Sequence, residues 1–239
     1  MITLQTTASG YGFQTQQSSS DRNVEAGKST ETKDGELSEM SLGKEVDSVS
    51  ISDAALLARK HGLANASTQY YEQFMPTYEG FSAATIAEGI SNPGVDAFSA
   101  GKSFDQVAID ARASLDNNYE RLESIGKPYI AASAQSIDRN SLVGELDRRA
   151  QYAVASNEGG LFTKDEQLSA SAKLTQQTSL AMGLYSGPTS EKEKFIDPFM
   201  GDNAQKFKAG MQFLDQVSKE EKAGSIEYAY QRASLQRSY

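Results

Sequence analysis

Apolar residues recur every three or four positions from about residue 50 onward, which is the period of an amphipathic helix. The clearest run extends from Phe104 to about Ile125, with Ser103 before it and Gly126 after it. Its apolar positions form one continuous face: Phe104, Val107, Ala108, Ala111, Leu115, Tyr119 and Leu122. The pattern predicts a long helix with this face turned toward a core.

The same period and similar end signals predict further helices along the chain. They are expected over residues 50–62, 67–75, 82–90, 140–154, 163–182, 190–196 and 203–217, and from 225 onward. Ser103 with Gln106 and Thr163 with Glu166 have the spacing of capping boxes, and Asn203 is the expected cap of its helix. No stretch alternates apolar and polar residues with a period of two, so the expected fold class is all-α, an irregular helical domain.

Residues 1–48 differ in composition from the rest of the chain. The first fifty residues hold nine Ser and six Thr, and their aromatic residues are Tyr11 and Phe13. Such a segment cannot bury enough apolar surface to offset the entropy lost on ordering, so it is expected to be disordered. The predicted organisation is therefore a disordered N-terminal tail of residues 1–48 and a helical domain of residues 49–239.

Charge and composition exclude several classes of partner. The 239 residues carry 32 acids against 23 Lys and Arg, a net charge of -9, and the basic residues are interleaved with acids. Nucleic acid is therefore not an expected partner. The absence of cysteine excludes disulfides, thiolate nucleophiles and Cys-ligated zinc. No run approaches the roughly 18 apolar residues that span a bilayer, and no secretory signal is visible, so a cytoplasmic location without a transmembrane segment is expected.

The segment between two predicted helices, residues 155–166, has the skeleton of a calcium-binding EF-hand loop. Such a loop takes oxygen ligands from positions 1, 3, 5, 7, 9 and 12 and needs glycine at position 6. With Glu166 at position 12, Gly160 falls at position 6 and the apolar Phe162 at position 8. The candidate calcium ligands in this register are Asn157, the Leu161 carbonyl, Thr163 and Glu166.

Two positions that should supply oxygen lack it, because Ala155 stands at position 1 and Gly159 at position 5. Ligand charge sets calcium affinity, so at most weak binding of a divalent cation is expected. The alternative needs no metal: Gly159 and Gly160 make a tight turn, and Thr163 with Glu166 caps the next helix. The sequence favours this metal-free turn, and it predicts no other cofactor.

No constellation of residues points to an enzyme. Gly101-Lys102-Ser103 ends like a phosphate-binding loop, but Asp96 stands where such a loop needs glycine. His61 is the only histidine, so it cannot belong to a multi-histidine metal site, and the chain has no G-x-S-x-G nucleophile elbow. A non-enzymatic role is favoured.

Two resemblances add to this picture. The first twenty residues, rich in Ser, Thr and Gln and without an acid before Asp21, resemble the export signals of bacterial type III secretion substrates. SFDQVAIDARASLDNNYERLESIGKPY and LDRRAQYAVASNEGGLFTKDEQ resemble segments of uncharacterised proteobacterial helical proteins, and SVSISDAALLA is also similar to a short stretch of flagellar anti-sigma factors. These resemblances imply a bacterial protein, cytoplasmic or exported by a type III or flagellar-type route.

The sequence therefore favours an interaction or adaptor protein whose protein partner it does not identify. The alternatives are an effector secreted by a type III or flagellar-type route, and weak cation binding through the loop 155–166. The last residues offer a candidate docking segment in Tyr228, Tyr230 and Tyr239 with Arg232 and Arg237, since Tyr and Arg are favoured at interface hot spots. A last helix packed on the core explains the same residues, and that interpretation is preferred.

Overall fold

The computed structural model describes residues 67–131 and 136–238. The chain divides into two units, Met1–Val49 and Ser50–Tyr239, and every described residue belongs to the second. The predicted disordered tail, the boundary after residue 48 and the helix expected over 50–62 lie outside the described residues. Within those residues the fold is all-α, without a strand, as predicted.

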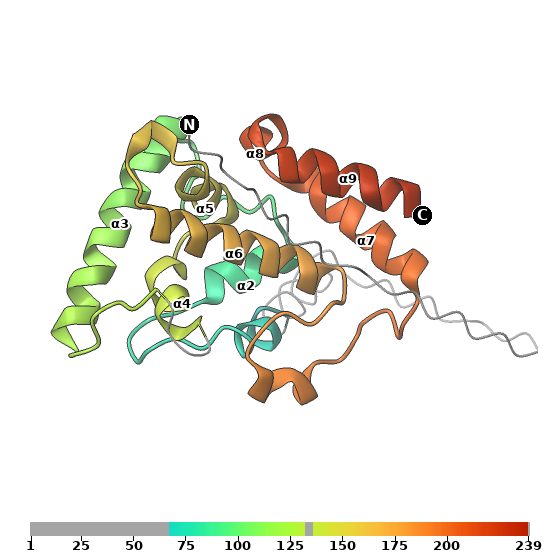
Figure 1. Ribbon diagram of the computed structural model, residues 1–239, viewed down its shortest axis with the longest axis horizontal. Coiled ribbons are helices and arrows are strands. Elements are labelled where there is room, and N and C mark those ends of the chain that lie inside the picture. Colours follow the sequence, from blue (N-terminus) through green and yellow to red (C-terminus); the bar gives the residue numbers. More distant parts are fainter. Residues whose placement is uncertain (1–66, 132–135, 239) are drawn as a thin grey trace, which may run out of the picture. The chain divides into compact units, whose positions relative to one another are not determined.

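The helices vary in length, and two of them, η2 and η3, are 3-10 helices. In chain order they are α2 (Ala84–Ser91), α3 (Phe104–Ser124), α4 (Ile137–Val143), α5 (Arg148–Ala155), η2 (Glu158–Gly160), α6 (Lys164–Ala181), η3 (Thr189–Lys194), α7 (Asn203–Gln216), α8 (Lys219–Gly224) and α9 (Ile226–Ser238) (Figure 1). Helical backbone over 67–72 precedes α2, in place of the longer helix expected over 67–75.

Helix α6 holds the centre of the described fold. It packs against α5, α2, α4 and α7, and α3 packs on α5. The main core lies among α2 to α6, and its largest fully buried apolar side chains include Phe74, Met75, Ile86, Leu115, Leu142, Leu146 and Leu180. A smaller cluster joins α7 to α9, which lie side by side in Figure 1, through Phe213, Leu214, Val217 and Leu235.

The single helix predicted over 140–154 is wrong: residues 144–147 divide it into α4 and α5. Gly144 follows α4 and passes so close to the Ser82 backbone that a Cβ there would collide with the Ser82 carbonyl oxygen. Asp147 then begins α5, because its side chain accepts a hydrogen bond from Ala150 N at 2.9 Å. The apolar period continues across the break, so the period alone did not reveal it.

The predicted caps have mixed outcomes. Thr163 and Glu166 form a complete capping box at the start of α6, which confirms that prediction. Ser103 caps α3 by accepting from Gln106 N, but the Gln106 side chain donates to Asp110 instead of turning back to the cap. The expected cap of α7, Asn203, is wrong, because Asp202 accepts from Gln205 N and Asn203 is the first residue of the helix.

Two short elements also differ from the prediction. The helix expected over 190–196 is the 3-10 helix η3, and α8 was not predicted. Helix α8 has only six residues, too few for a helical period to be visible in the sequence.

Candidate functional site

The loop with the EF-hand skeleton is a hydrogen-bonded turn between α5 and α6. Gly159 and Gly160 both have positive φ, 67° and 71°, which explains why glycine stands at both positions. Asn157 is also left-handed, and its Oδ1 accepts a hydrogen bond from Phe162 N at 2.9 Å. The Leu161 side chain is partly exposed beside the turn. Of the four predicted ligand residues, Asn157, Leu161 and Thr163 lie in this turn, and Glu166 is the third residue of α6.

The Glu166 carboxylate is buried and already bound by protein groups. Arg112 Nη1 on α3 donates to its two oxygens at 2.8 and 2.9 Å, and Thr163 N donates to Oε2 at 2.7 Å. The Thr163 hydroxyl in turn accepts from Glu166 N. Burial opposes ionisation of Glu166, but the hydrogen bonds from Thr163 and Arg112 outweigh it and hold the pKa of this carboxyl below its usual value. Glu166 therefore joins the start of α6 to α3.

Glu166→Gln is expected to destabilise the protein by about 2 kcal/mol at neutral pH, the usual scale for a hydrogen bond to a charged group. Because the folded-state pKa of Glu166 is lowered, its stabilisation is complete above the unfolded-state pKa and is lost as pH falls through the folded-state pKa. Urea denaturation at several pH values checks this, with Asp165→Asn, an exposed neighbouring acid, as control. A stability difference between wild type and Glu166→Gln that persists unchanged into strong acid contradicts the assignment.

Calcium at this loop would have to displace the Arg112 guanidinium from Glu166. Millimolar calcium chloride is therefore expected to leave the melting temperature of the wild type nearly unchanged, as measured by thermal denaturation against magnesium chloride at equal ionic strength. A rise of several degrees that disappears in Glu166→Gln would instead establish the loop as a calcium site. Across residues 67–131 and 136–238, no three His, Cys, Asp or Glu side chains gather closely enough to hold a metal ion.

Helix α9 divides its side chains between two environments. Leu235 is buried and Tyr228 partly buried against the cluster on α7, which fits the preferred interpretation of a packed last helix. Ile226 and Tyr230, in contrast, are 83% and 70% exposed. The alternative of an exposed docking segment therefore applies to one face of the same helix.

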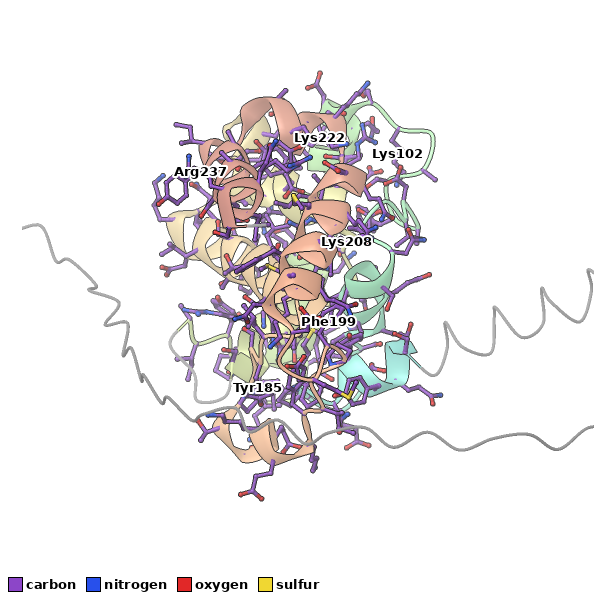
Figure 2. The ribbon with its side chains drawn as sticks, turned by 90° about the vertical axis from the view of Figure 1, so that its right-hand side faces the viewer. Lys102, Tyr185, Phe199, Lys208, Lys222 and Arg237 are labelled. Atoms are coloured by element: carbon purple, nitrogen blue, oxygen red, sulfur yellow. The ribbon has the colours of Figure 1, made fainter. Side chains whose placement is uncertain are left out.

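The exposed residues of α9 form a strip. Ala229 and Ala233 are exposed like Ile226 and Tyr230, and the spacing of three and four residues puts them on one face; we call Ile226, Ala229, Tyr230 and Ala233 the α9 strip. Arg237, four residues beyond Ala233, is exposed on the same face. Figure 2 shows it at the left edge of the molecule, toward the same end as Lys222. Of the other predicted docking residues, Arg232 is paired with Asp215 and Tyr239 lies outside the described residues.

Lys173, which the sequence reasoning missed, is 3% exposed in the middle of α6. Its Nζ donates to Asn140 Oδ1 and, at 2.8 Å, to Gln176 Oε1. The amide nitrogens of these two residues donate to backbone carbonyls, Asn140 to Pro76 and Gln176 to Ser186. Both amides are thereby oriented with their oxygens toward the lysine.

Burial and, to a smaller extent, the nearby positive charge of Arg139 together lower the pKa of Lys173 to about 7. A signal for this residue exists in the sequence. Lys173 follows Ala170 by three residues and precedes Gln177 by four, so the helical period puts it on the buried face of α6.

The other motifs considered in the sequence have structural roles or lie outside the described residues. Lys102 pairs with Asp110 at 2.8 Å and donates to the Phe98 carbonyl, and Ser103 caps α3. His61 lies outside the described residues. None of the described helices is both long and apolar enough to cross a membrane. The chain matches no protein-family model, no curated protein and no solved structure.

Proposed function

We propose that this protein is an interaction module that binds a protein partner through the α9 strip. The supporting observation is that four neighbouring positions of one helix face expose Ile, Ala, Tyr and Ala, while the opposite face of α9 packs on α7. Single exposed apolar residues are ordinary, but a strip at helical spacing is what a helix presents to a second helix.

The partner we propose is an amphipathic helix that carries an acidic residue near one end of its apolar face. Ala229 and Ala233 leave room for the backbone of a second helix, and Ile226 and Tyr230 supply the apolar contacts beside them. Arg237 at the end of the strip favours an acid on the partner at that point, because electrostatic complementarity sets register and orientation. Tyr and Arg are also among the residues most enriched at interface hot spots.

Site-specific photo-crosslinking in the cells that produce the protein tests this proposal. A photoreactive phenylalanine analogue replaces Tyr230 in the full chain, and the same analogue replaces Leu168 as control, since Leu168 is another exposed apolar residue, on α6. A discrete adduct is expected from position 230 and not from position 168. Equal adducts from both positions, or none from 230, would overturn the proposal.

The partner identified from the adduct is then purified, and its affinity is measured for the wild type and for two variants. Ile226→Asp with Tyr230→Asp should weaken binding by at least about tenfold, the loss of one hot spot, while Leu168→Asp should leave it unchanged. Circular dichroism checks that the variants are folded, since surface substitutions of this kind change the free energy of unfolding by about 0.5 kcal/mol or less. If the adduct is a second copy of this chain, light scattering reports a dimer and the partner helix is α9 itself or another segment of the chain.

A second candidate function, export by a type III or flagellar-type route, rests on the absence of any charged side chain before Asp21. A secretion assay compares the full chain with a variant that lacks residues 1–50. Release of both forms to the same extent would remove this candidate and leave the cytoplasmic location as the proposal.

A further inference from the structure

A pocket of about 420 Å³ opens beside Lys173, at some distance from the α9 strip. Its walls include Lys173, Asn140 and Gln176, with Ser186 from the segment before η3 and Thr189 and Ser190 from the start of η3. Tyr185, next to Ser186 in the chain, lies toward the opposite end of the molecule from Lys222 and Arg237 in Figure 2. A volume of this size falls in the range of small-molecule sites.

The charge of Lys173 has no counter-ion in the described part of the chain. Its two acceptors, Asn140 Oδ1 and Gln176 Oε1, are neutral, and every residue lining the pocket other than Lys173 is uncharged. An ammonium has three N–H groups, and the described residues offer acceptors for two of them. The third N–H of Lys173 and its uncompensated charge are therefore available to a group bound in the pocket.

A second cation adds to this charge. Arg139, beside Asn140 on α4, acts on Lys173 with a positive charge, and its Nε is buried without a hydrogen-bond partner in the described structure. The neighbouring Asp138 is engaged with Tyr78 and with the Ile130 amide. In a chain whose net charge is -9, these two cations act beside a pocket whose lining contains no acidic residue.

We propose that this pocket binds the anionic group of a small molecule, a carboxylate or a phosphoryl group, on the Lys173 ammonium. One oxygen of the anion accepts the remaining N–H of Lys173, and the negative charge offsets those of Lys173 and Arg139. Asn140 and Gln176 hold the amine in place, since their own amide nitrogens are fixed on backbone carbonyls. This inference is independent of the α9 strip.

Titration calorimetry of the full chain with sodium acetate and, separately, with sodium phosphate at constant ionic strength tests the proposal. Saturable binding of at least one anion is expected, and the anion bound distinguishes a carboxylate site from a phosphoryl site. Lys173→Met should weaken it by at least about tenfold, since the loss of a charged hydrogen bond is worth about that much or more. Lys164→Met, an exposed lysine on the same helix, should leave the affinity within about twofold of the wild type.

Two further measurements keep the test decisive if Lys173→Met folds poorly. Thr189→Trp, at the exposed rim, should obstruct the pocket without touching the amine. For an acetate site, affinity should fall about fivefold between about pH 7 and about pH 8, because an amine with a pKa of about 7 loses most of its remaining protonated fraction over that interval. The absence of saturable binding with both anions, or equal affinity in wild type, Lys173→Met and Thr189→Trp, would overturn the proposal.

Discussion

Glu221→Gln is expected to destabilise the protein by about 3–5 kcal/mol, the usual cost of removing one partner from a buried ion pair. Glu221 and Arg148 are 5% and 3% exposed, and the guanidinium donates to both carboxylate oxygens, from Nε at 3.0 Å and from Nη2 at 2.7 Å. A glutamine side chain has a single acceptor oxygen, so it cannot replace both carboxylate oxygens, and the Arg148 charge would remain buried without a counter-ion.

The position of this pair explains why the effect is large. Arg148 begins α5 and Glu221 belongs to α8, so the pair attaches the C-terminal helices to the core (Figure 1). Arg148 also donates to the Leu174 carbonyl and to Gln177 on α6, and its guanidinium lies 4.7 Å from the centre of the Phe213 ring on α7. The loss of the Glu221 charge is therefore expected to disturb the other contacts of Arg148 as well.

Urea denaturation followed by circular dichroism measures the effect of Glu221→Gln. The matched control is Glu145→Gln, which removes the acid of an ion pair to Arg121 in which both side chains are well exposed, and it should cost no more than about 1 kcal/mol. Arg148→Met with Glu221→Met should lose less stability than the sum of the two single changes, since neither leaves a buried charge. Equal losses in Glu221→Gln and Glu145→Gln would contradict the structural role of the buried pair.

Asp147→Ala is expected to cost about 3–5 kcal/mol, because it removes several hydrogen bonds to a fully buried charged group. Asp147 Oδ2 accepts from Phe98 N at 2.9 Å and from Ser99 N at 2.7 Å, while Oδ1 accepts from the Ser99 hydroxyl and from Ala150 N. One carboxylate thus caps α5 and holds the loop that precedes α3.

Asp202→Ala is the matched control, since Asp202 is an exposed cap of α7 that accepts from Gln205 N. Its loss should cost about 1 kcal/mol, as is usual for a helix cap. Thermal and urea denaturation of both variants give the comparison. A cost for Asp147→Ala no greater than that for Asp202→Ala would mean that the bonds to Phe98 and Ser99 contribute little to stability.

The features that sequence reasoning predicted well are those set by neighbouring residues. Helix α3 begins one residue after the predicted cap Ser103, and α6 begins with the predicted box of Thr163 and Glu166. Caps, turn glycines and the helical period act over a few residues, so they can be read without knowing the packing. The same holds for the all-α class of the described residues.

The predictions that failed depend on residues distant in the chain. The apolar period runs through Gly144, where α4 has ended and where the Ser82 backbone passes too close for any side chain. Asp147 caps α5 through a local bond to Ala150 N, but its other three hydrogen bonds come from residues 98 and 99, which are distant in the chain. Such contacts are not visible as a local pattern.

The candidate sites divide in the same way. The helical period assigned apolar residues to α9, but only packing on α7 decided that Tyr228 is partly buried and Tyr230 exposed. The capping role of Glu166 was local and predictable, whereas its bond to Arg112 on α3 joins residues 54 apart in the chain. Lys173 lies on a predictable helix face, yet its pocket exists because α4 and the segment before η3 close around it. Sequence determines which side chains a helix presents to each side, and tertiary packing decides which charges meet a partner, because desolvation and long-range pairing depend on the whole fold.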